Sequence, residues 1–287
     1  MSYESGNAKI LIISGATASG KSSLALKIAQ EKNGVIINAD AMQLYKELPI
    51  LSAQPSEDDL KLAPHFLYST LKHNQNSSLA IWLDLAIEQI NLALKNNQLP
   101  IVVGGTGLYL SKLIDGINKI PKIDPSLTKK IRQISDKKDL IKELKDLGET
   151  FDGLEVLDKQ RLARRLEVFQ QTGESLSWWQ DQPNEIFYPK EYFKHHNIEI
   201  PRSDLYQNCD SRLESMIGKG AIREVESLLE KDLSDDSLIT KTIGFSQIRD
   251  FLERKITIDE AINIASQKTR NYAKRQLTWF KNQFKYD

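Results

Sequence analysis

Residues 15–22 have the composition of a phosphate-binding loop. The eight residues that fit the pattern GxxxxGK[ST] are Gly15, Ala16, Thr17, Ala18, Ser19, Gly20, Lys21 and Ser22. They follow the apolar run 10–13, and a strand that ends in such a turn directs backbone N–H groups and a helix N-terminus at one point, where a di- or triphosphate can bind. Lys21 would neutralise phosphate oxygens and Ser22 would hold Mg²⁺. Kinases, NTPases and other diphosphate-using enzymes share this loop, so it does not identify a reaction.

Two further strand ends carry polar residues that should reach the same point. Asp40 follows the apolar run 35–38, and Thr106 lies among the glycines that follow the run 101–103. The carboxyl ends of parallel strands form the ligand crevice of such a sheet, so both side chains should face the phosphate loop. Asp40 could act there as a base or could only cap the next helix, and a tight turn explains the glycines almost as well as a ligand does.

The strand and helix pattern predicts an α/β fold: a P-loop NTPase-like doubly wound parallel sheet with a mostly helical insertion domain. Apolar runs at 10–14, 35–38 and 101–103 alternate with helical periodicity, as at 79–94. After Pro121 the strand signals nearly vanish, apart from a weak one at 197–200. We therefore expect a catalytic domain of residues 1–120 and 204–287 and an insertion domain of residues 121–203.

Length and composition exclude several classes of protein. The 287 residues can bury a core without staples, and the single cysteine, Cys209, excludes an internal disulfide framework. No apolar stretch approaches membrane-spanning length and no leader is evident, so we expect a cytoplasmic protein without a membrane segment. The four histidines show no metal-ligand spacing with Cys209.

Taken together, these segments resemble the tRNA dimethylallyltransferases, also called tRNA isopentenyltransferases. GATASGKS, NADAMQLYKELPILSAQP, GGTGLYLSKLIDG, QRLARRLEVFQQTG and AKRQLTWFK follow one another in that family's order and approximate spacing. The resemblance implies transfer of a dimethylallyl group from dimethylallyl diphosphate to the N6 amine of the adenosine 3′-adjacent to the anticodon in tRNA, with release of diphosphate. It implies that Asp40 takes a proton from the amine, that Thr106 positions Asp40 or the allyl group, and that Arg212 joins Lys21 at the diphosphate.

The resemblance also implies that the tRNA anticodon stem-loop is the partner and that one copy of the protein, a monomer, suffices. The residues expected to contact tRNA are Asp40, Ala41, Met42, Gln43, Gln160, Arg161, Leu162, Ala163, Arg164, Arg165, Lys241, Gly244, Arg270, Lys274, Arg275 and Lys281. Arg161 and Arg165 are four apart and share a helix face, where they could grip phosphates, and the cations of the final helix align beside an apolar arc. The basic face of Arg161 and Arg165 could also be simply solvated.

Three residues depart from the family pattern, and two other functions stay open. Ala41 stands where serine is usual, Gln54 where lysine is common and Ser246 where arginine is frequent, which bears on affinity and target range rather than on the reaction. A P-loop small-molecule kinase would not need the basic final helix. A prenyltransferase of free adenine nucleotides would not need the long helical region after residue 121.

Overall fold

The computed structural model describes residues 8–233, 237–284 and 286. The chain forms two compact units, Met1–Ile114 with Phe187–Asp287 and, between them in sequence, Asp115–Ile186. These boundaries differ from the expected insertion domain of residues 121–203 at both ends. The reason at the second boundary is β7 (Phe193–Ile198), which pairs with β1 and so belongs to the first unit.

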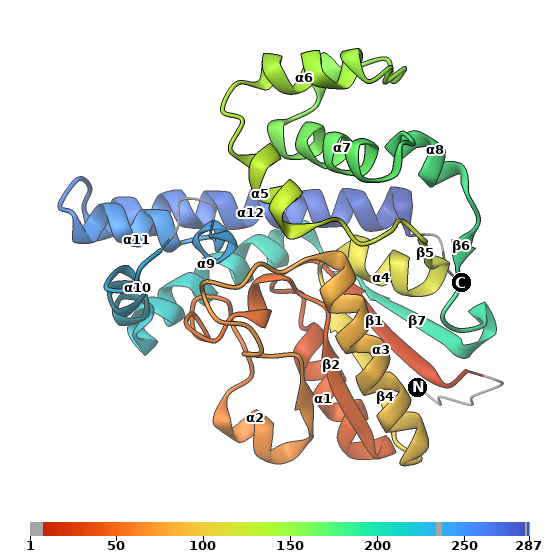
Figure 1. Ribbon diagram of the computed structural model, residues 1–287. Coiled ribbons are helices and arrows are strands. Elements are labelled where there is room, and N and C mark those ends of the chain that lie inside the picture. Colours follow the sequence, from red (N-terminus) through yellow and green to blue (C-terminus); the bar gives the residue numbers. More distant parts are fainter. Residues whose placement is uncertain (1–7, 234–236, 285, 287) are drawn as a thin grey trace. The chain divides into compact units, whose positions relative to one another are not determined.

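A five-stranded parallel sheet forms the centre of the first unit (Figure 1). Its strands are β1 (Ile10–Gly15), β2 (Gly34–Asn38), β3 (His65–Phe66), β4 (Leu99–Gly104) and β7, in the order β3-β2-β4-β1-β7. Every paired neighbour in this sheet is parallel. The expected α/β class with a P-loop-like parallel sheet is confirmed, although the weak strand signal at 197–200 marked only the end of β7.

The two faces of the sheet are covered by different helices. Leu11, Ile13 and their neighbours on β2 and β4 share a core with Ala25 and Ile28 of α1 (Lys21–Lys32). Because side chains alternate along a strand, Ile12 faces the other side, where α3 (Leu79–Lys95) packs on β2 and β4 (Figure 1). The sheet is therefore buried on both faces, which explains its nearly continuous apolar strands.

Further helices complete the first unit. They are α2 (Glu57–Leu62), α4 (Gly107–Asp115), α9 (Arg202–Lys219), α10 (Ala221–Leu229), α11 (Phe245–Leu252) and α12 (Ile258–Gln283). The last helix, α12, packs on α9, α11 and β1. Short 3₁₀ turns occur at Met42–Leu44, Lys190–Tyr192 and Leu238–Lys241. In the described part of the chain, no helix combines the length and apolarity needed to cross a membrane.

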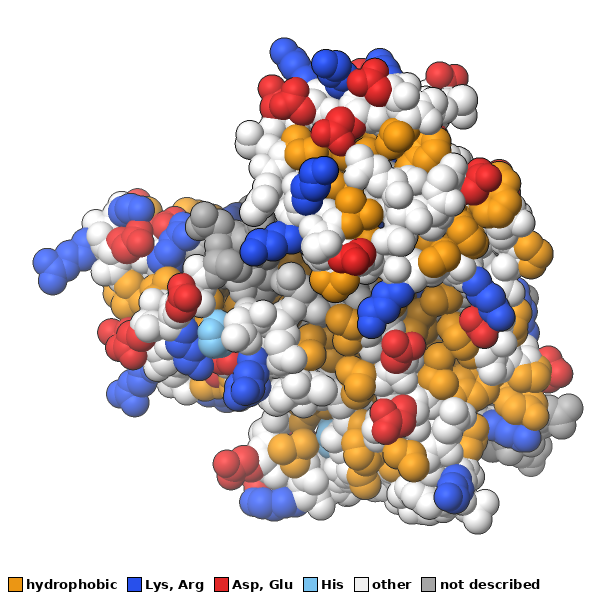
Figure 2. Space-filling model, viewed as in Figure 1, with side chains coloured by type: hydrophobic (Ala, Val, Ile, Leu, Met, Phe, Trp, Pro, Cys, Tyr) orange, Lys and Arg blue, Asp and Glu red, His pale blue; other side chains and the backbone are white. Residues whose placement is uncertain are grey.

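The second unit is a small helical unit with its own core. It contains α5 (Pro125–Arg132), α6 (Lys137–Asp146), α7 (Lys159–Thr172), α8 (Leu176–Asp181), the 3₁₀ turn Leu154–Val156 and a two-stranded antiparallel ribbon of β5 (Ile117–Asn118) and β6 (Asn184–Glu185). Ile131, Leu140, Leu144 and Leu162 are buried together. The surface over α6 mixes lysines with acidic side chains, so it does not present one sign of charge (Figure 2).

Candidate active site

The phosphate loop ends at a helix whose N-terminus is open. α1 begins at Lys21, and Gly20 before it is left-handed, with φ of 94°. Among the described residues no side chain caps this end, so the first N–H groups of the helix are available to an anion. A cavity of about 350 Å³ lies here, lined by Ala18, Ser19, Gly20, Lys21, Ser22, Ser23, Asn208, Ser211 and Arg212.

Some polar groups of the loop are engaged within the protein. The Thr17 N–H donates to the Gln276 side chain at 2.7 Å, and the Ser19 N–H donates to the Ala16 carbonyl at 3.3 Å. The same Ala16 carbonyl accepts from Lys21 Nζ at 2.6 Å. These contacts stabilise the loop itself and leave the N–H groups at the start of α1 for a phosphate.

Two partly buried cations, Lys21 and Arg212, line the same cavity at the loop. Burial lowers the pKa of Lys21 to about 8, and the Arg212 charge acts in the same direction, against the opposite effect of Asp40. Burial also lowers the pKa of Arg212, whose guanidinium lies 3.4 Å from the Thr17 hydroxyl. Because like charges that have lost their hydration are relieved by a bound anion, this pair suits a diphosphate.

Asp40 is fixed at the end of β2 by the buried Asn38 side chain. Asn38 accepts a hydrogen bond from the Asp40 N–H at 2.8 Å and donates to the Asp40 carbonyl at 2.9 Å. One Asp40 carboxylate oxygen accepts from the Met42 N–H at 2.9 Å, so this carboxylate does fix the turn that follows it. Asp40 also lines two further cavities next to the phosphate loop. Its carboxylate can therefore stabilise the turn and also face a ligand.

The turn after β4 brings Thr106 beside the turn that carries Asp40. Thr106 Oγ1 accepts from the Ala41 N–H at 3.3 Å, and the Thr106 N–H donates to the Ala39 carbonyl at 3.3 Å. A Cβ atom at Gly104 would lie 2.1 Å from that carbonyl oxygen, so only glycine allows this approach. The structure therefore brings together the two polar side chains that were expected to meet at the strand ends.

A second cavity, of about 400 Å³, opens from the same residues. Its polar lining includes Thr17, Asp40, Thr106, Arg212, Lys241 and Arg275, and its apolar lining includes Met42, Leu51, Leu213, Met216 and Ile243. Arg212 lines this cavity and also the cavity at the phosphate loop. A molecule with an anionic end and a short apolar end could therefore place its junction at Arg212, close to Asp40.

Two tyrosines near Asp40 add hydrogen-bond donors to the site. Tyr68 lines a smaller cavity with Lys21, Ser22 and Asp40, and Tyr272 lines the larger one. Burial raises the pKa of both hydroxyls, and the negative charge of Asp40 adds to the effect, so both stay protonated. No sequence signal marked Tyr68, because it follows β3, a strand of two residues without a recognisable pattern.

The segment 48–54, which contributes Leu51 to the larger cavity, is held by two side chains. The Glu224 carboxylate accepts from the N–H groups of Ile50 and Leu51 at 2.7 and 2.9 Å. Gln43 donates to two carbonyls of the same segment at 2.9 Å each. Gln43 was expected to contact RNA, and its amide nitrogen supports a wall of the cavity.

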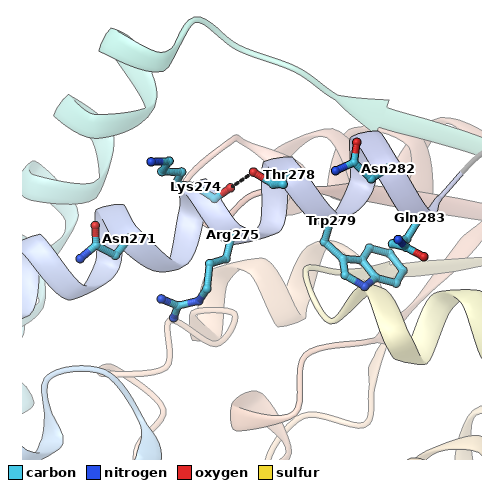
Figure 3. Close-up of a pocket in the computed structure, with 7 residues that line it drawn as sticks. All are labelled: Asn271, Lys274, Arg275, Thr278, Trp279, Asn282 and Gln283. Carbon is cyan, nitrogen blue, oxygen red and sulfur yellow. Dashed lines mark hydrogen bonds between the residues drawn. The ribbon is translucent and has the colours of Figure 1, made fainter. Parts of the chain in front are cut away.

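The final helix presents cations and an aromatic ring on a concave surface. A pocket of about 520 Å³ is lined by Asn271, Lys274, Arg275, Thr278, Trp279, Asn282 and Gln283 (Figure 3). Arg275 and Trp279 point to one side of α12, whereas Lys274 points to the other. Lys274, Arg275 and Lys281 are exposed, as a surface for a polyanion requires, whereas Arg270 pairs with Asp210 and is only 24% exposed.

Several residues expected to contact RNA are buried, which corrects that expectation. Leu162 and Ala163 belong to the core of the second unit, and the buried Arg165 pairs with Glu149 at 3.2 Å. Arg161 and Arg165 are four residues apart on α7, as expected. However, α5, α6 and α8 all pack on α7, so little of the surface of α7 stays free. Gln160, Arg161 and Arg164 are exposed.

Gly244 is also buried, and its role is steric. Its φ is 99°, and a Cβ atom there would lie 2.8 Å from a methyl group of Leu51. Glycine therefore lets the start of α11 approach the segment 48–54, and contact with RNA is not needed to explain it.

Comparison with known proteins identifies the family. Residues 43–283 match the family described as IPP transferase, and residues 8–69 match the one described as isopentenyl transferase. The chain therefore belongs to the IPP transferase family of enzymes, and the resemblance found in its motifs is confirmed.

Individual relatives agree with this assignment. The tRNA dimethylallyltransferase of Rickettsia bellii is 40% identical over 281 residues, covering 96% of this chain and 89% of the relative. That of Ehrlichia chaffeensis is 38% identical over 280 residues, covering 96% and 91%. A eukaryotic dimethylallyltransferase acting on tRNA superposes with a TM-score of 0.77 at 26% identity, over 96% of this chain and 71% of that one. The tRNA isopentenylpyrophosphate transferase of Bacillus halodurans gives 0.68 at 26% identity, over 96% and 87%.

Proposed function

We propose that this enzyme transfers a dimethylallyl group from dimethylallyl diphosphate to the N6 amine of the adenosine 3′-adjacent to the anticodon in tRNA. One observation carries the proposal: Arg212 lines both the phosphate-loop cavity and the cavity that holds Asp40 and Thr106. A diphosphate bound at the loop then has its ester oxygen near Arg212 and its allyl carbon toward Asp40. The family membership and the tRNA named for the relatives support this assignment of the two cavities.

The residues divide the chemistry between the leaving group and the nucleophile. The C1–O bond of the allyl diphosphate breaks and its electron pair leaves with the diphosphate, where the N–H groups of α1, Lys21 and Arg212 stabilise the added negative charge. The N6 lone pair forms the new N–C1 bond. The Asp40 carboxylate then takes a proton from that nitrogen, which restores its neutrality. Thr106 positions the base or the allyl group, and Arg212 supplies a fixed positive charge because guanidinium stays protonated.

The donor atoms at the loop fit Mg²⁺. The Ser22 hydroxyl and the Asp40 carboxylate line one small cavity, and Mg²⁺ prefers a few protein oxygens completed by phosphate oxygens and water. We therefore assign Ser22 as its ligand. When bound, Mg²⁺ would neutralise charge on the diphosphate. In the described part of the chain no group of three His, Cys, Asp or Glu residues could hold a metal, so such an ion would depend on the substrate's oxygens.

The RNA would be held by cations on α12 and near the larger cavity. Lys241, Lys274, Arg275 and Lys281 are exposed and suit contacts with phosphates that offset the cost of unstacking one adenosine. Arg161 and Arg164 of α7 remain candidates for the same task. A single copy contains all of these groups, so we propose a monomer that works on tRNA in the cytoplasm.

The test is transfer of labelled dimethylallyl from its diphosphate to unmodified tRNA in the presence of Mg²⁺. The proposal predicts label at N6 of the adenosine next to the anticodon, and a loss of about 10²–10⁴-fold in kcat for Asp40→Ala. A matched control is Asp84→Ala, because Asp84 is an exposed carboxylate on α3 outside the site.

Two other outcomes would replace the proposed function. Label in free AMP but not in tRNA would replace the proposal with a nucleotide prenyltransferase. Transfer of phosphate from ATP to a small acceptor, without transfer of dimethylallyl, would make the enzyme a kinase.

A further inference from the structure

We infer that Gln276 is a positioning residue that sets the spacing between the phosphate loop and the turn that carries Thr106. The inference rests on the proposed function, because it assigns a part of that same site to a residue of the final helix. Gln276 is 6% exposed and comes from α12, more than 250 residues after the loop.

The Gln276 amide bridges the turn that follows β1 and the turn that follows β4, which are neighbouring strands of the sheet. Its Oε1 accepts from the Thr17 N–H at 2.7 Å, and its Nε2 donates to the Gly105 carbonyl at 2.8 Å. An amide is suited to this bridge because it offers one acceptor and one donor on a planar group of fixed width. β1 and β4 pair up to Ser14 and Gly104, and the Gln276 side chain continues the link between the two turns beyond that point.

The glycines of the second turn fit this contact. A Cβ atom at Gly105 would lie 2.2 Å from Gln276 Nε2, and one at Gly107 would lie 2.1 Å from the Trp279 ring. Both glycines therefore give space to α12, one on each side of Thr106. The turn is shaped for the final helix, and α12 in turn fixes where the Thr106 hydroxyl lies.

The bridge also restricts which groups of the loop bind the diphosphate. Since the Thr17 N–H donates to Gln276, it is not free for a phosphate oxygen, and the loop is held at its midpoint while the start of α1 remains open. Loss of the bridge would free the loop and the turn to move separately. Both the affinity for diphosphate and the alignment of Thr106 with the allyl carbon should then fall.

The decisive variants replace the amide with side chains of the same length. Gln276→Met fills the space without either hydrogen bond and should lower kcat at least tenfold and weaken binding of inorganic diphosphate severalfold, with KM for tRNA within about twofold. Gln30→Met, at an exposed position of α1, is the matched control and should change neither.

Gln276→Glu separates positioning from simple support of the fold. A protonated glutamic acid has the same donor and acceptor as glutamine, whereas a carboxylate repels the Gly105 carbonyl. Burial favours the protonated form, so the ratio of variant to native kcat should rise as the pH falls from about 8 to about 6. A residue that only filled space would give a ratio that does not change with pH.

A double-mutant cycle tests the link to Thr106. If Gln276 acts through that turn, Gln276→Met should cost much less in kcat when Thr106 is already alanine. Native kcat and diphosphate affinity in Gln276→Met, or fully additive effects together with a flat pH ratio, would overturn the inference. A native protein that transfers no label to tRNA, but whose affinity for diphosphate falls in Gln276→Met, would overturn the proposed function and leave this inference standing.

Discussion

The pair formed by Arg165 and Glu149 makes a quantitative prediction about the second unit. Their side chains are 7% and 0% exposed and lie 3.2 Å apart, and the guanidinium also stacks 3.8 Å from the Phe151 ring. The Ser177 hydroxyl accepts a further hydrogen bond from Arg165 at 3.1 Å. The charge is therefore neutralised inside the unit and serves its stability.

Replacing only the arginine should be costly. Arg165→Met leaves the Glu149 carboxylate buried without its counter-charge, which in other proteins lowers the free energy of unfolding by about 3–5 kcal/mol. Arg161→Met on the same helix removes the ion pair of Arg161 with Asp158, whose side chains are 72% and 62% exposed. This change should lower the free energy of unfolding by less than about 1 kcal/mol. Adding Glu149→Leu to Arg165→Met removes the unpaired charge and should recover most of the loss.

Hydrogen exchange followed by mass spectrometry locates the effect. The loss in Arg165→Met should appear in amides of residues 115–186, with amides of the parallel sheet close to native, and urea unfolding should give the same order of variants. A loss below about 1 kcal/mol for Arg165→Met, or an equal loss for Arg161→Met, would refute the reasoning. The first result would mean that the Arg165–Glu149 pair contributes little to stability. The second would mean that the exposure of an ion pair does not decide how much its loss destabilises the protein.

Three further predictions concern the first unit. Burial lowers the pKa of Lys21 to about 8, and only the protonated amine attracts the anion. Binding of dimethylallyl diphosphate to the native protein, measured by calorimetry, should therefore weaken about tenfold from about pH 7 to about pH 9 relative to binding by Lys21→Arg. Lys274→Ala and Arg275→Ala should each weaken tRNA binding and reduce the slope of log affinity against log salt by about 1, measured by filter binding across a salt series, with no change for an exposed lysine of α1. Gly107→Ala should abolish most transfer activity, because its Cβ would lie 2.1 Å from an indole ring, whereas Gly218→Ala, with no atom within 4 Å, should keep it.

The sequence predicted the parts of the site that depend on short-range rules. A parallel sheet brings its strand ends to one edge, so the phosphate loop, Asp40 and Thr106 could be placed together once three strands were recognised. The glycine at 104 likewise followed from a turn, and the structure adds that it allows approach to the Ala39 carbonyl. These inferences needed no knowledge of how distant helices pack.

The errors arose where packing between distant elements decides. Helical periodicity placed Arg161 and Arg165 on one face of α7, but periodicity alone does not tell whether a neighbouring helix covers that face. The expected strand at 197–200 covered only the end of β7, because the residues of this strand are mostly polar. His195 and Asn197 hydrogen-bond Ser14 of β1 at 2.7 and 2.9 Å, so polar contacts satisfy a strand that hydropathy does not mark.

The final helix combines an exposed basic surface with a buried contact to the phosphate loop. Lys274 and Arg275 are exposed, whereas the next residue, Gln276, is buried against the phosphate loop. Successive residues of a helix differ by about 100°, so one turn can face both the proposed RNA surface and the proposed diphosphate site. A backbone shift of α12 on RNA binding would therefore act on the Thr17 N–H directly. It follows that substitutions at 274 and 275 should be judged by diphosphate affinity as well as by tRNA affinity, because only the first reports a displaced helix.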